Sequence, residues 1–306
     1  MTQPAPLPPF DRVYVEITNR CNLRCSFCAG TSRPPASMDP DFFAAVLAQV
    51  RPLTGQICLH VLGEPLLHPE LPLVLEHCAA AGLLVNLTTN GTLLAGLEKV
   101  LLEAGALRQI NFSLQALVRG DDIDQHALDA VLAFARRLST DRPALYVNFR
   151  LWTLDSLTDP GSGAAATRIL EGLAQALDMA RPVPPAGRKS LRLLGRMYLH
   201  QDTAFAWPGD LTTPERKQGF CHALSTHCAI LTDGTVCPCC LDANGRLALG
   251  SLREASLTDI LASARATAMR EGFAAGRLVE TLCRHCTYCR RFTKHDSRAT
   301  ASRRAS

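Results

Sequence analysis

Three cysteines near the start of the chain, Cys21, Cys25 and Cys28, have the residue type and the spacing for metal chemistry. They follow residues 12–18, where β-branched and aromatic residues alternate with polar ones, as is typical of a strand. Thiolates on a loop just past a strand end can hold three irons of a 4Fe–4S cluster and leave the fourth iron open to a small molecule. The alternative is a structural zinc or disulfide site, but zinc usually takes two pairs of ligands, and this spacing does not supply them.

Polar residues at the ends of later strands form a second set of candidates. The apolar run 57–62 predicts a buried parallel strand, and Gly63 and Glu64 follow it directly. A glycine there lets the backbone approach a ligand closely, although an ordinary strand-to-helix turn is the plain alternative. Ser113 and Arg150 are expected at the ends of the fourth and fifth strands. An arginine in an otherwise apolar strand needs a partner, and its guanidinium pairs well with a carboxylate.

A second group of cysteines lies beyond Trp207. A hairpin predicted over 229–236 has Asp-Gly at its turn and leads into three of these cysteines, and three more lie close together further on. The group consists of Cys221, Cys228, Cys237, Cys239, Cys240, Cys283, Cys286 and Cys289. Thiols this dense indicate a metal site, and both a zinc ribbon and an iron–sulfur cluster use such spacing.

The elements that must position these residues alternate along the chain. Apolar periodicity and capping signals predict the following strands and helices: strands at 12–18, 57–62, 83–88, 108–114, 145–152 and 191–199, and helices at 40–50, 70–81, 93–104, 124–138, 164–179 and 258–272. Strands that alternate with helices of this length predict βα units and a parallel sheet. Counting the units gives a partial (β/α)6-type barrel of the α/β class. Ligands in such folds bind at the carboxyl ends of the strands, where the polar candidates lie.

The first cysteine motif resembles the cluster motif of the radical S-adenosylmethionine (SAM) superfamily. The resemblance implies that Cys21, Cys25 and Cys28 hold a 4Fe–4S cluster whose open iron binds SAM. It also implies that one electron, supplied by a donor such as flavodoxin or ferredoxin, cleaves SAM to a 5′-deoxyadenosyl radical that abstracts hydrogen from the substrate.

The turn after the second predicted strand resembles the Gly-Gly-Glu-Pro motif of the same family, with Leu62 in place of the first glycine. The resemblance implies that the backbone edge at Gly63 meets the amino group of SAM and that Glu64 helps to fix it. It further implies that Ser113 and Arg150 hold the SAM carboxylate.

The later cysteines resemble the SPASM extension of radical SAM enzymes, which binds auxiliary iron–sulfur clusters. Cys221, Gly234 and Cys239 match its opening spacing, but its closing block is abbreviated here and no cysteine follows Cys289. The resemblance implies at least one auxiliary cluster, for which four thiolates suffice. The expected ligands are Cys221, Cys239 or Cys240, Cys283 and Cys286, and Cys228 and Cys289 are able to join or replace them.

The resemblance covers about residues 12–292 and implies a partial (β/α)6 radical SAM barrel with a small cysteine-rich SPASM/twitch-like module. We expect the chain to be divided into these parts: a Pro-rich arm at 1–10, the radical SAM core at 11–207, the SPASM-like module at 208–292 and a flexible basic tail at 293–306.

Composition limits the cellular setting. The chain has 306 residues, 47% of them hydrophobic, and a net charge of +4, which by itself implies no nucleic-acid partner. Its start lacks the pattern of an export signal, and no apolar run approaches the length of a membrane span. We therefore expect a cytoplasmic protein whose 13 cysteines bind metal and do not form disulfides.

The resemblance favours a radical SAM enzyme that modifies a peptide or protein substrate, because SPASM-like modules often accompany such modification. The same chemistry on a small metabolite, such as a sugar or amino-acid precursor, is the second interpretation. A non-catalytic iron–sulfur or zinc carrier is the non-enzyme alternative, but a carrier needs no SAM site, and the turn at 63–65 argues against it.

Overall fold

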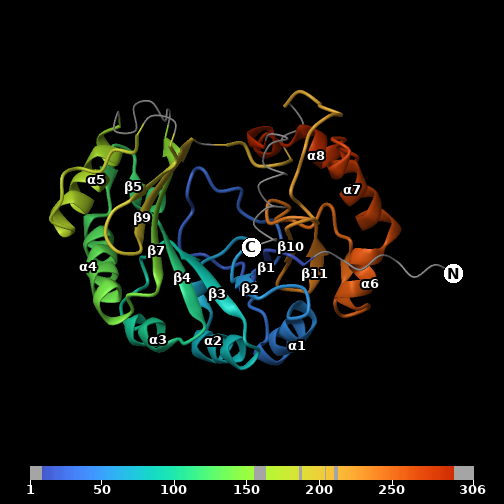
Figure 1. The fold of residues 1–306 in the computed structure, drawn as a ribbon, viewed down its shortest axis with the longest axis horizontal. Helices are drawn as coiled ribbons and strands as arrows, with labels where there is room; N and C mark the ends of the chain where they lie inside the picture. The colour runs from blue at the N-terminus through green and yellow to red at the C-terminus, as the bar shows by residue number, and fades with distance from the viewer. Residues whose placement is uncertain (1–8, 155–162, 186–187, 204, 210–212, 293–306) are drawn as a thin grey trace.

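The computed structural model describes residues 9–154, 163–185, 188–203, 205–209 and 213–292 (Figure 1). The expected basic tail and all but the last two residues of the Pro-rich arm lie outside these ranges. The strands are β1 (Arg12–Val15), β2 (Gln56–Cys58), β3 (Leu84–Thr89), β4 (Leu107–Ser113), β5 (Val118–Arg119), β6 (Asp122–Ile123), β7 (Tyr146–Leu154), β8 (Ser190–Arg192), β9 (Met197–Thr203), β10 (His227–Ile230), β11 (Thr235–Cys237) and β12 (Gly250–Ser251). The α-helices are α1 (Pro40–Val50), α2 (Leu71–Ala80), α3 (Glu98–Glu103), α4 (Gln125–Asp141), α5 (Ala164–Ala176), α6 (Leu257–Ala262), α7 (Ala264–Ala274) and α8 (Thr281–His285). Short 3-10 helices cover Pro65–Leu67, Leu114–Leu117 and Tyr288–Arg291.

Among the described residues, ten strands form one sheet in the order β12-β11-β10-β1-β2-β3-β4-β7-β9-β8. Strands β1, β2, β3, β4, β7 and β9 are successive parallel neighbours, which confirms the predicted partial (β/α)6 barrel. Helices α1 to α5 lie along the outer face of this sheet (Figure 1). Two short strands, β5 and β6, pair separately.

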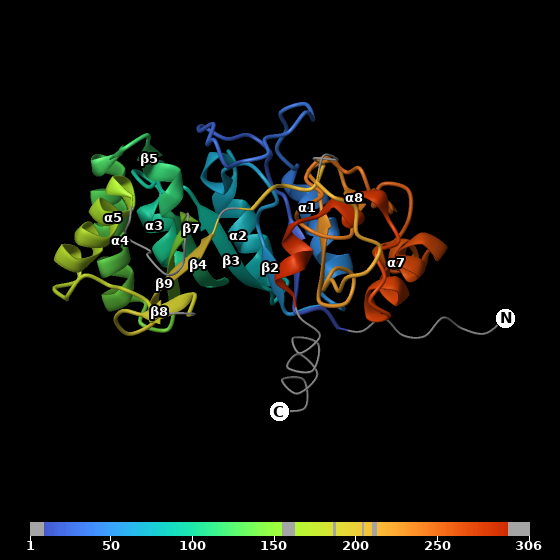
Figure 2. The same ribbon diagram turned by 90° about the horizontal axis from the view of Figure 1, so that it is seen from above.

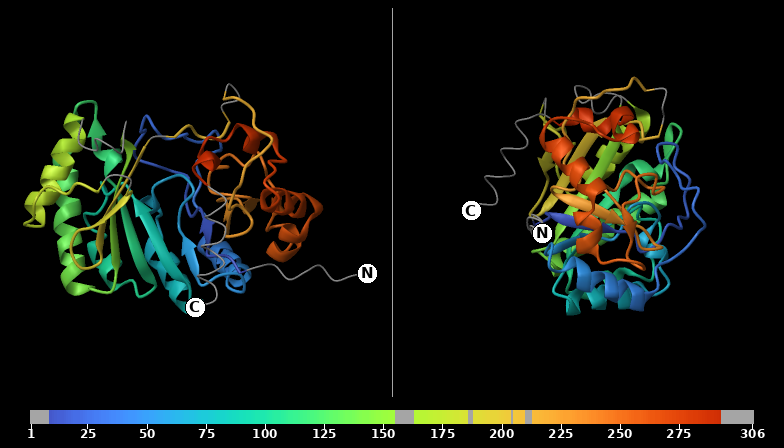
Figure 3. Two further views of the ribbon diagram at one scale, coloured as in Figure 1. Left: turned by 45° about the horizontal axis from the view of Figure 1, so that its top comes forward. Right: turned by 90° about the vertical axis from the view of Figure 1, so that its right-hand side faces the viewer.

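The cysteine-rich C-terminal part extends the same sheet. Strand β10 pairs in parallel with β1, and β11 and β12 follow it as antiparallel strands, so the predicted hairpin is confirmed. Helices α6 to α8 therefore lie at the β12 end of the sheet, while α4 and α5 lie at the opposite end (Figure 2). The loop that follows β1 lies between these two ends (Figure 3). The pairing of β10 with β1 thus brings the second cysteine group close to the first.

Residues alternate along the parallel strands between a helix-covered face and an inner face. The outward residues are fully buried apolar side chains, among them Val13, Ile57, Val85 and Phe112. The inner face is polar and is arranged in layers set by the strand register. One layer consists of Tyr14, Cys58, Asn86 and Gln109. A second consists of Thr88, Asn111 and Asn148, and a third of Ser113, Arg150 and His200.

Several predicted elements have different bounds in the structure. The helix predicted at 93–104 covers only α3, because Gly96 has a φ of +83°, which lies outside the helical region. The run predicted as one strand at 191–199 instead comprises the end of β8, the turn after it and the start of β9, so that the sixth parallel strand is β9.

The helix predicted at 258–272 is two helices, α6 and α7. They are separated at Ser263, whose side chain caps α7 by accepting a hydrogen bond from the backbone N–H of Ala266 at 3.3 Å. In contrast, α1 begins where expected, because Asp39 accepts hydrogen bonds from two N–H groups of its first turn. None of the helices in the described ranges has both the length and the apolar character that crossing a bilayer requires.

Candidate functional site

A cavity of about 1020 Å³ opens at the carboxyl ends of the parallel strands. It is lined by the first cysteine motif, by the turn at Gly63 and Glu64, by Ser113 and Arg150, and by part of the second cysteine group. The cysteines of that group on its wall are Cys221, Cys239, Cys240, Cys283, Cys286 and Cys289. The tertiary structure thus brings all the residues predicted for the site to one cavity.

Cys21, Cys25 and Cys28 lie on the loop between β1 and α1, at the mouth of the cavity. Cys21 and Cys28 are exposed and Cys25 is partly exposed. Backbone N–H groups of Leu23 and Gly30 point at the sulfurs of Cys21 and Cys28, each at 3.5 Å. Burial raises the pKa of Cys21, and the hydrogen bond from the N–H of Leu23 opposes the rise. All 13 cysteines lie in the described ranges, and none of them forms a disulfide.

Gly63 and Glu64 form a tight turn against the end of β1. Gly63 has a φ of +77°, and a Cβ atom there would lie 2.2 Å from the carbonyl oxygen of Thr18, so only glycine fits. Glu64 is buried, and its carboxylate accepts hydrogen bonds from the N–H groups of Leu66 at 3.0 Å and Asn90 at 2.7 Å. Burial raises the pKa of Glu64, and these hydrogen bonds oppose the rise. Each carboxylate oxygen of Glu64 therefore already accepts a hydrogen bond from a backbone N–H group.

Ser113 and Arg150 are register partners on β4 and β7. The Arg150 guanidinium lies 4.6 Å from the ring centroid of Trp152 and donates to the Thr88 hydroxyl at 3.4 Å. Within the described residues, no carboxylate lies within ion-pair distance of it. Burial lowers the pKa of Arg150, and nearby Tyr14 and Cys58 oppose the change. A half-buried guanidinium that has no carboxylate partner among the described residues and lines a cavity is able to bind an anion there.

His60 lies on the cavity wall in the segment after β2. Its Nδ1 atom is buried and has no hydrogen-bond partner in the described structure. Burial, together with the positive charge of Arg150, lowers the pKa of His60 to about 3. The ring is therefore neutral at physiological pH, and its Nδ1 has no partner among the described residues.

Four thiols of the second group influence one another's ionisation. Burial raises the pKa of Cys221 to about 11, and Cys286 adds to this effect. Burial also raises the pKa values of Cys239 and Cys283, and the thiol of Cys221 raises both further. Thiols with raised pKa values lose their protons when a metal centre binds, because its positive charge compensates the negative charge of the thiolates.

The remaining thiols of this group have other surroundings. Cys240 is hydrogen-bonded to Tyr14, and its pKa is also affected by Cys58 across the cavity wall. Cys228 is completely buried in the core on β10. Cys289 donates to the carbonyl oxygen of Cys286 at 3.2 Å. Cys221, Cys239, Cys283 and Cys286 therefore lie close to one another, and Cys240 and Cys289 lie close enough to affect members of this set.

The donor sets fit clusters. No three His, Cys, Asp or Glu side chains in the described residues converge on one point as ligands of a single metal ion must. In a 4Fe–4S cluster each cysteine binds a different iron, so its thiols surround a volume and need not meet. Three thiols of the loop after β1 and six of the second group line one cavity, and thiols are the ligands that such clusters take.

Sequence reasoning missed His60, the inner polar layers and an ion pair between Glu16 and Arg33. A signal for the layers existed, because every second residue of the strands at β3, β4 and β7 is polar. Glu16 is completely buried, and both of its oxygens lie 2.7 Å from an Arg33 nitrogen. A glutamate in a buried strand signals that it has a partner, but nothing in the sequence identifies Arg33 as that partner.

Comparisons with known proteins agree with this geometry. Residues 15–140 match the model of the radical SAM superfamily, and residues 221–287 match that of SPASM, an iron–sulfur cluster-binding domain. The PqqA peptide cyclase of Xanthomonas euvesicatoria pv. vesicatoria is 33% identical over 141 residues, which is 44% of this chain and 36% of that protein. The chain thus matches about a third of the length of this curated relative.

Two solved structures share the fold. BtrN in complex with AdoMet and 2-DOIA has a TM-score of 0.58 at 18% identity and covers 91% of this chain and 93% of its own. Streptococcus suis SuiB bound to the precursor peptide SuiA has a TM-score of 0.54 at 13% identity, with 92% of this chain and 71% of SuiB covered. The two family matches imply a 4Fe–4S cluster with SAM and auxiliary iron–sulfur clusters, which fit the two cysteine sets. Residues 15–140 are therefore a radical SAM domain, and residues 221–287 are a C-terminal SPASM domain.

Proposed function

We propose that the protein is an enzyme that reductively cleaves SAM and modifies a peptide or protein substrate by hydrogen abstraction. The observation that carries this proposal is the single cavity shared by the Cys21, Cys25 and Cys28 loop, the unpaired guanidinium of Arg150 and the SPASM cysteines. A carrier of metal or electrons needs no cavity of this size beside its cluster.

Each predicted residue has a proposed role in this cavity. Cys21, Cys25 and Cys28 hold the first cluster, which supplies the electron for cleavage of the SAM sulfonium. Arg150 and Ser113 hold the SAM carboxylate. The turn at Gly63 presents its backbone to the amino group, and Glu64 acts by keeping that turn in place through Leu66 and Asn90. Cys221, Cys239, Cys283 and Cys286 hold one auxiliary cluster, and Cys240 lies at its edge.

Arg150→Ala should weaken SAM binding and leave the cluster spectrum intact. Loss of a charge-assisted pair with a carboxylate costs about 1.5–3 kcal/mol, so the dissociation constant should rise roughly ten- to a hundredfold. Titration of the reconstituted protein with SAM measures this. Arg196→Ala is the matched control, because Arg196 also stacks on a ring, that of Tyr146 at 4.8 Å, yet it does not line the cavity. Equal affinities in wild type and Arg150→Ala would assign Arg150 a purely structural role.

The peptide assignment is supported by the name of the curated relative, a peptide cyclase, and by the peptide bound in the SuiB structure. The cavity also has a wall of contacting aromatic rings. Phe205 lies 5.4 Å from Trp207 and 5.1 Å from Tyr288, measured between ring centroids, and Phe292 continues the row at 5.6 Å from Tyr288. Such a wall suits an apolar side chain that a peptide inserts.

A small metabolite is the second candidate, because BtrN matches this chain over nearly its whole length and holds 2-DOIA. Reduced, reconstituted protein should be incubated with SAM and either a short peptide encoded beside the gene or a panel of amino acids and aminosugars. We expect the peptide, and none of the metabolites, to increase the yield of 5′-deoxyadenosine over that without substrate. We also expect a mass change in the peptide and in no metabolite. A mass change confined to a metabolite would replace the peptide assignment.

A further inference from the structure

The loop that carries the first three cysteines, residues 19–36 (the cluster loop), contains no helix and no strand of the sheet. Its base is closed locally, because Asn19 donates to the carbonyl oxygen of Pro34 at 2.8 Å and accepts from the N–H of Ala36 at 2.7 Å. Its first limb is held by the barrel, where Asn90 donates to Asn22 at 3.0 Å. The position of Cys28 on the far limb therefore depends on other contacts.

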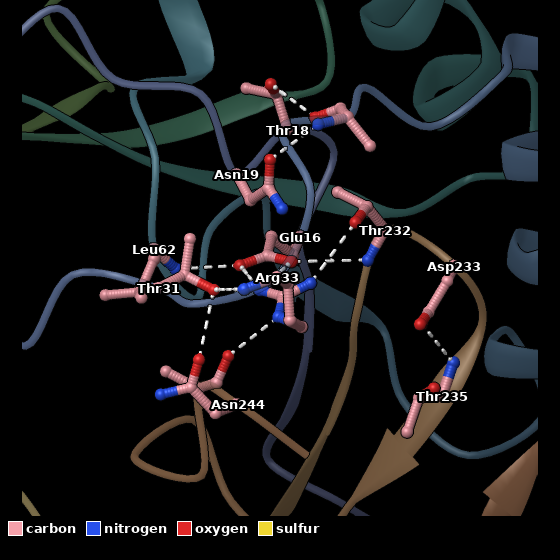
Figure 4. Close-up of polar contacts among 12 residues, drawn as sticks. Glu16, Thr18, Asn19, Thr31, Arg33, Leu62, Thr232, Asp233, Thr235 and Asn244 are labelled. Carbon is pink, nitrogen blue, oxygen red and sulfur yellow. Dashed lines mark hydrogen bonds and ion pairs between the residues drawn. The ribbon is translucent and has the colours of Figure 1, made fainter.

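The far limb is held by Arg33, which is surrounded by acceptors from distant parts of the chain (Figure 4). Its guanidinium binds both oxygens of Glu16 at 2.7 Å, the carbonyl oxygen of Ala243 at 3.0 Å and the hydroxyl of Thr232 at 3.3 Å. Glu16 in turn accepts from the N–H groups of Leu62 at 3.2 Å and Thr232 at 3.3 Å. One buried carboxylate thus joins β1, the cluster loop, the turn before Gly63 and the SPASM hairpin.

A second set of contacts reaches the same limb from the C-terminal part. Asn244 accepts from the Thr31 hydroxyl and from the N–H of Ser32, each at 3.1 Å (Figure 4). The indole N–H of Trp207 donates to the carbonyl oxygen of Phe27 at 2.8 Å, directly beside Cys28. The contacts of Asn244, the contact of Trp207, which lies outside 232–244, and the Arg33 fork would all have to break for the limb to move away.

We propose that residues 232–244 complete the site of the first cluster by holding the far limb of the cluster loop, with Arg33 and Asn244 as positioning residues. The same stretch carries Cys237, Cys239 and Cys240, so the two cysteine groups are mechanically coupled through it. Because of this coupling, the position of Cys28 depends on whether residues 232–244 are well ordered. The part of this proposal that concerns the first cluster rests on the proposed function. The part that concerns how Arg33 and Asn244 hold the cluster loop does not depend on that function.

The test uses the full-length chain with four variants. Arg33→Met removes the fork, Arg33→Lys keeps the charge next to Glu16 but cannot reach all acceptors, and Asn244→Ala removes only the second set of contacts. Arg142→Met is the matched control, because Arg142 bonds three backbone carbonyl oxygens at 2.7, 3.2 and 3.1 Å near the start of β4, away from the cavity.

Hydrogen exchange of the metal-free protein gives the first measurement. Amides of 29–36 should exchange at least about tenfold faster in Arg33→Met, and amides of 31–33 faster in Asn244→Ala, with no change there in Arg142→Met. After reconstitution, the SAM-dependent change in the spectrum of the reduced first cluster should be weakened in Arg33→Met, partly restored in Arg33→Lys and kept in Arg142→Met. Such a spectroscopic loss separates positioning from a general loss of stability.

Unchanged exchange of 29–36 in both Arg33→Met and Asn244→Ala would overturn the proposal, as would an equal acceleration in Arg142→Met. If Arg33→Met does not fold, Asn244→Ala decides alone, because it removes contacts only from a partly exposed side chain. A wild-type protein without any response to SAM would refute the proposed function, and the exchange comparison would still decide how the loop is held.

Discussion

Replacing Cys21, Cys25 and Cys28 together by alanine should abolish SAM cleavage and leave the iron of the SPASM cysteines in place. The two cysteine sets come from different segments, the loop after β1 and the stretches around Cys221, Cys239 and Cys283, so loss of one set removes no ligand of the other. Without thiolates at the cavity mouth there is no site for the cluster that supplies the electron. SAM cleavage is measured as the 5′-deoxyadenosine formed with dithionite as reductant, which is quantified by chromatography.

The control for the triple variant is Cys78→Ala. Cys78 is a completely buried core thiol on α2 that does not line the cavity, so its loss should leave SAM cleavage unchanged. If the triple variant still produces 5′-deoxyadenosine at the wild-type rate, the assignment of these three residues is wrong.

Replacing Cys283 and Cys286 together by alanine should remove about four irons per chain, one 4Fe–4S equivalent, and abolish product formation. Both residues belong to the set that includes Cys221 and Cys239, and α8 joins the cavity wall through them. Because metal ligation contributes to folding, the part that contains α6 to α8 should also become less stable. The SAM-dependent spectrum of the first cluster should remain.

The loss of iron is measured on anaerobically reconstituted protein from its iron and zinc contents and its Mössbauer spectra. Cys237→Ala is the matched control, because Cys237 lies on the same hairpin as Cys239 but its side chain does not line the cavity. Equal iron in the wild type and the double variant, or stoichiometric zinc in the wild type, would replace the auxiliary cluster by a structural zinc site.

Local patterns in the sequence determined much of this protein. The spacing of Cys21, Cys25 and Cys28 and the alternation of strands with helices identified the family and the barrel. Asp39 specified the start of α1, because a cap needs only neighbours a few residues away. Predictions failed mainly where a short element was read as a longer one, as at Gly96 and Ser263, since one residue's backbone angles or side chain was enough to break the helix.

Other features were decided only by tertiary structure. The sequence placed Cys239 and Cys240 side by side, but only the fold brings Cys239 close to Cys221 and Cys283 and brings Cys240 close to Tyr14 and Cys58. It also contained Glu16 and Arg33 without any sign that they pair, or that Thr232 and Ala243 complete the contact. These outcomes depend on the pairing of β10 with β1, more than 200 residues apart in the chain. Contacts at that separation are chosen by burial and register across the whole sheet, because no local propensity acts over such a distance.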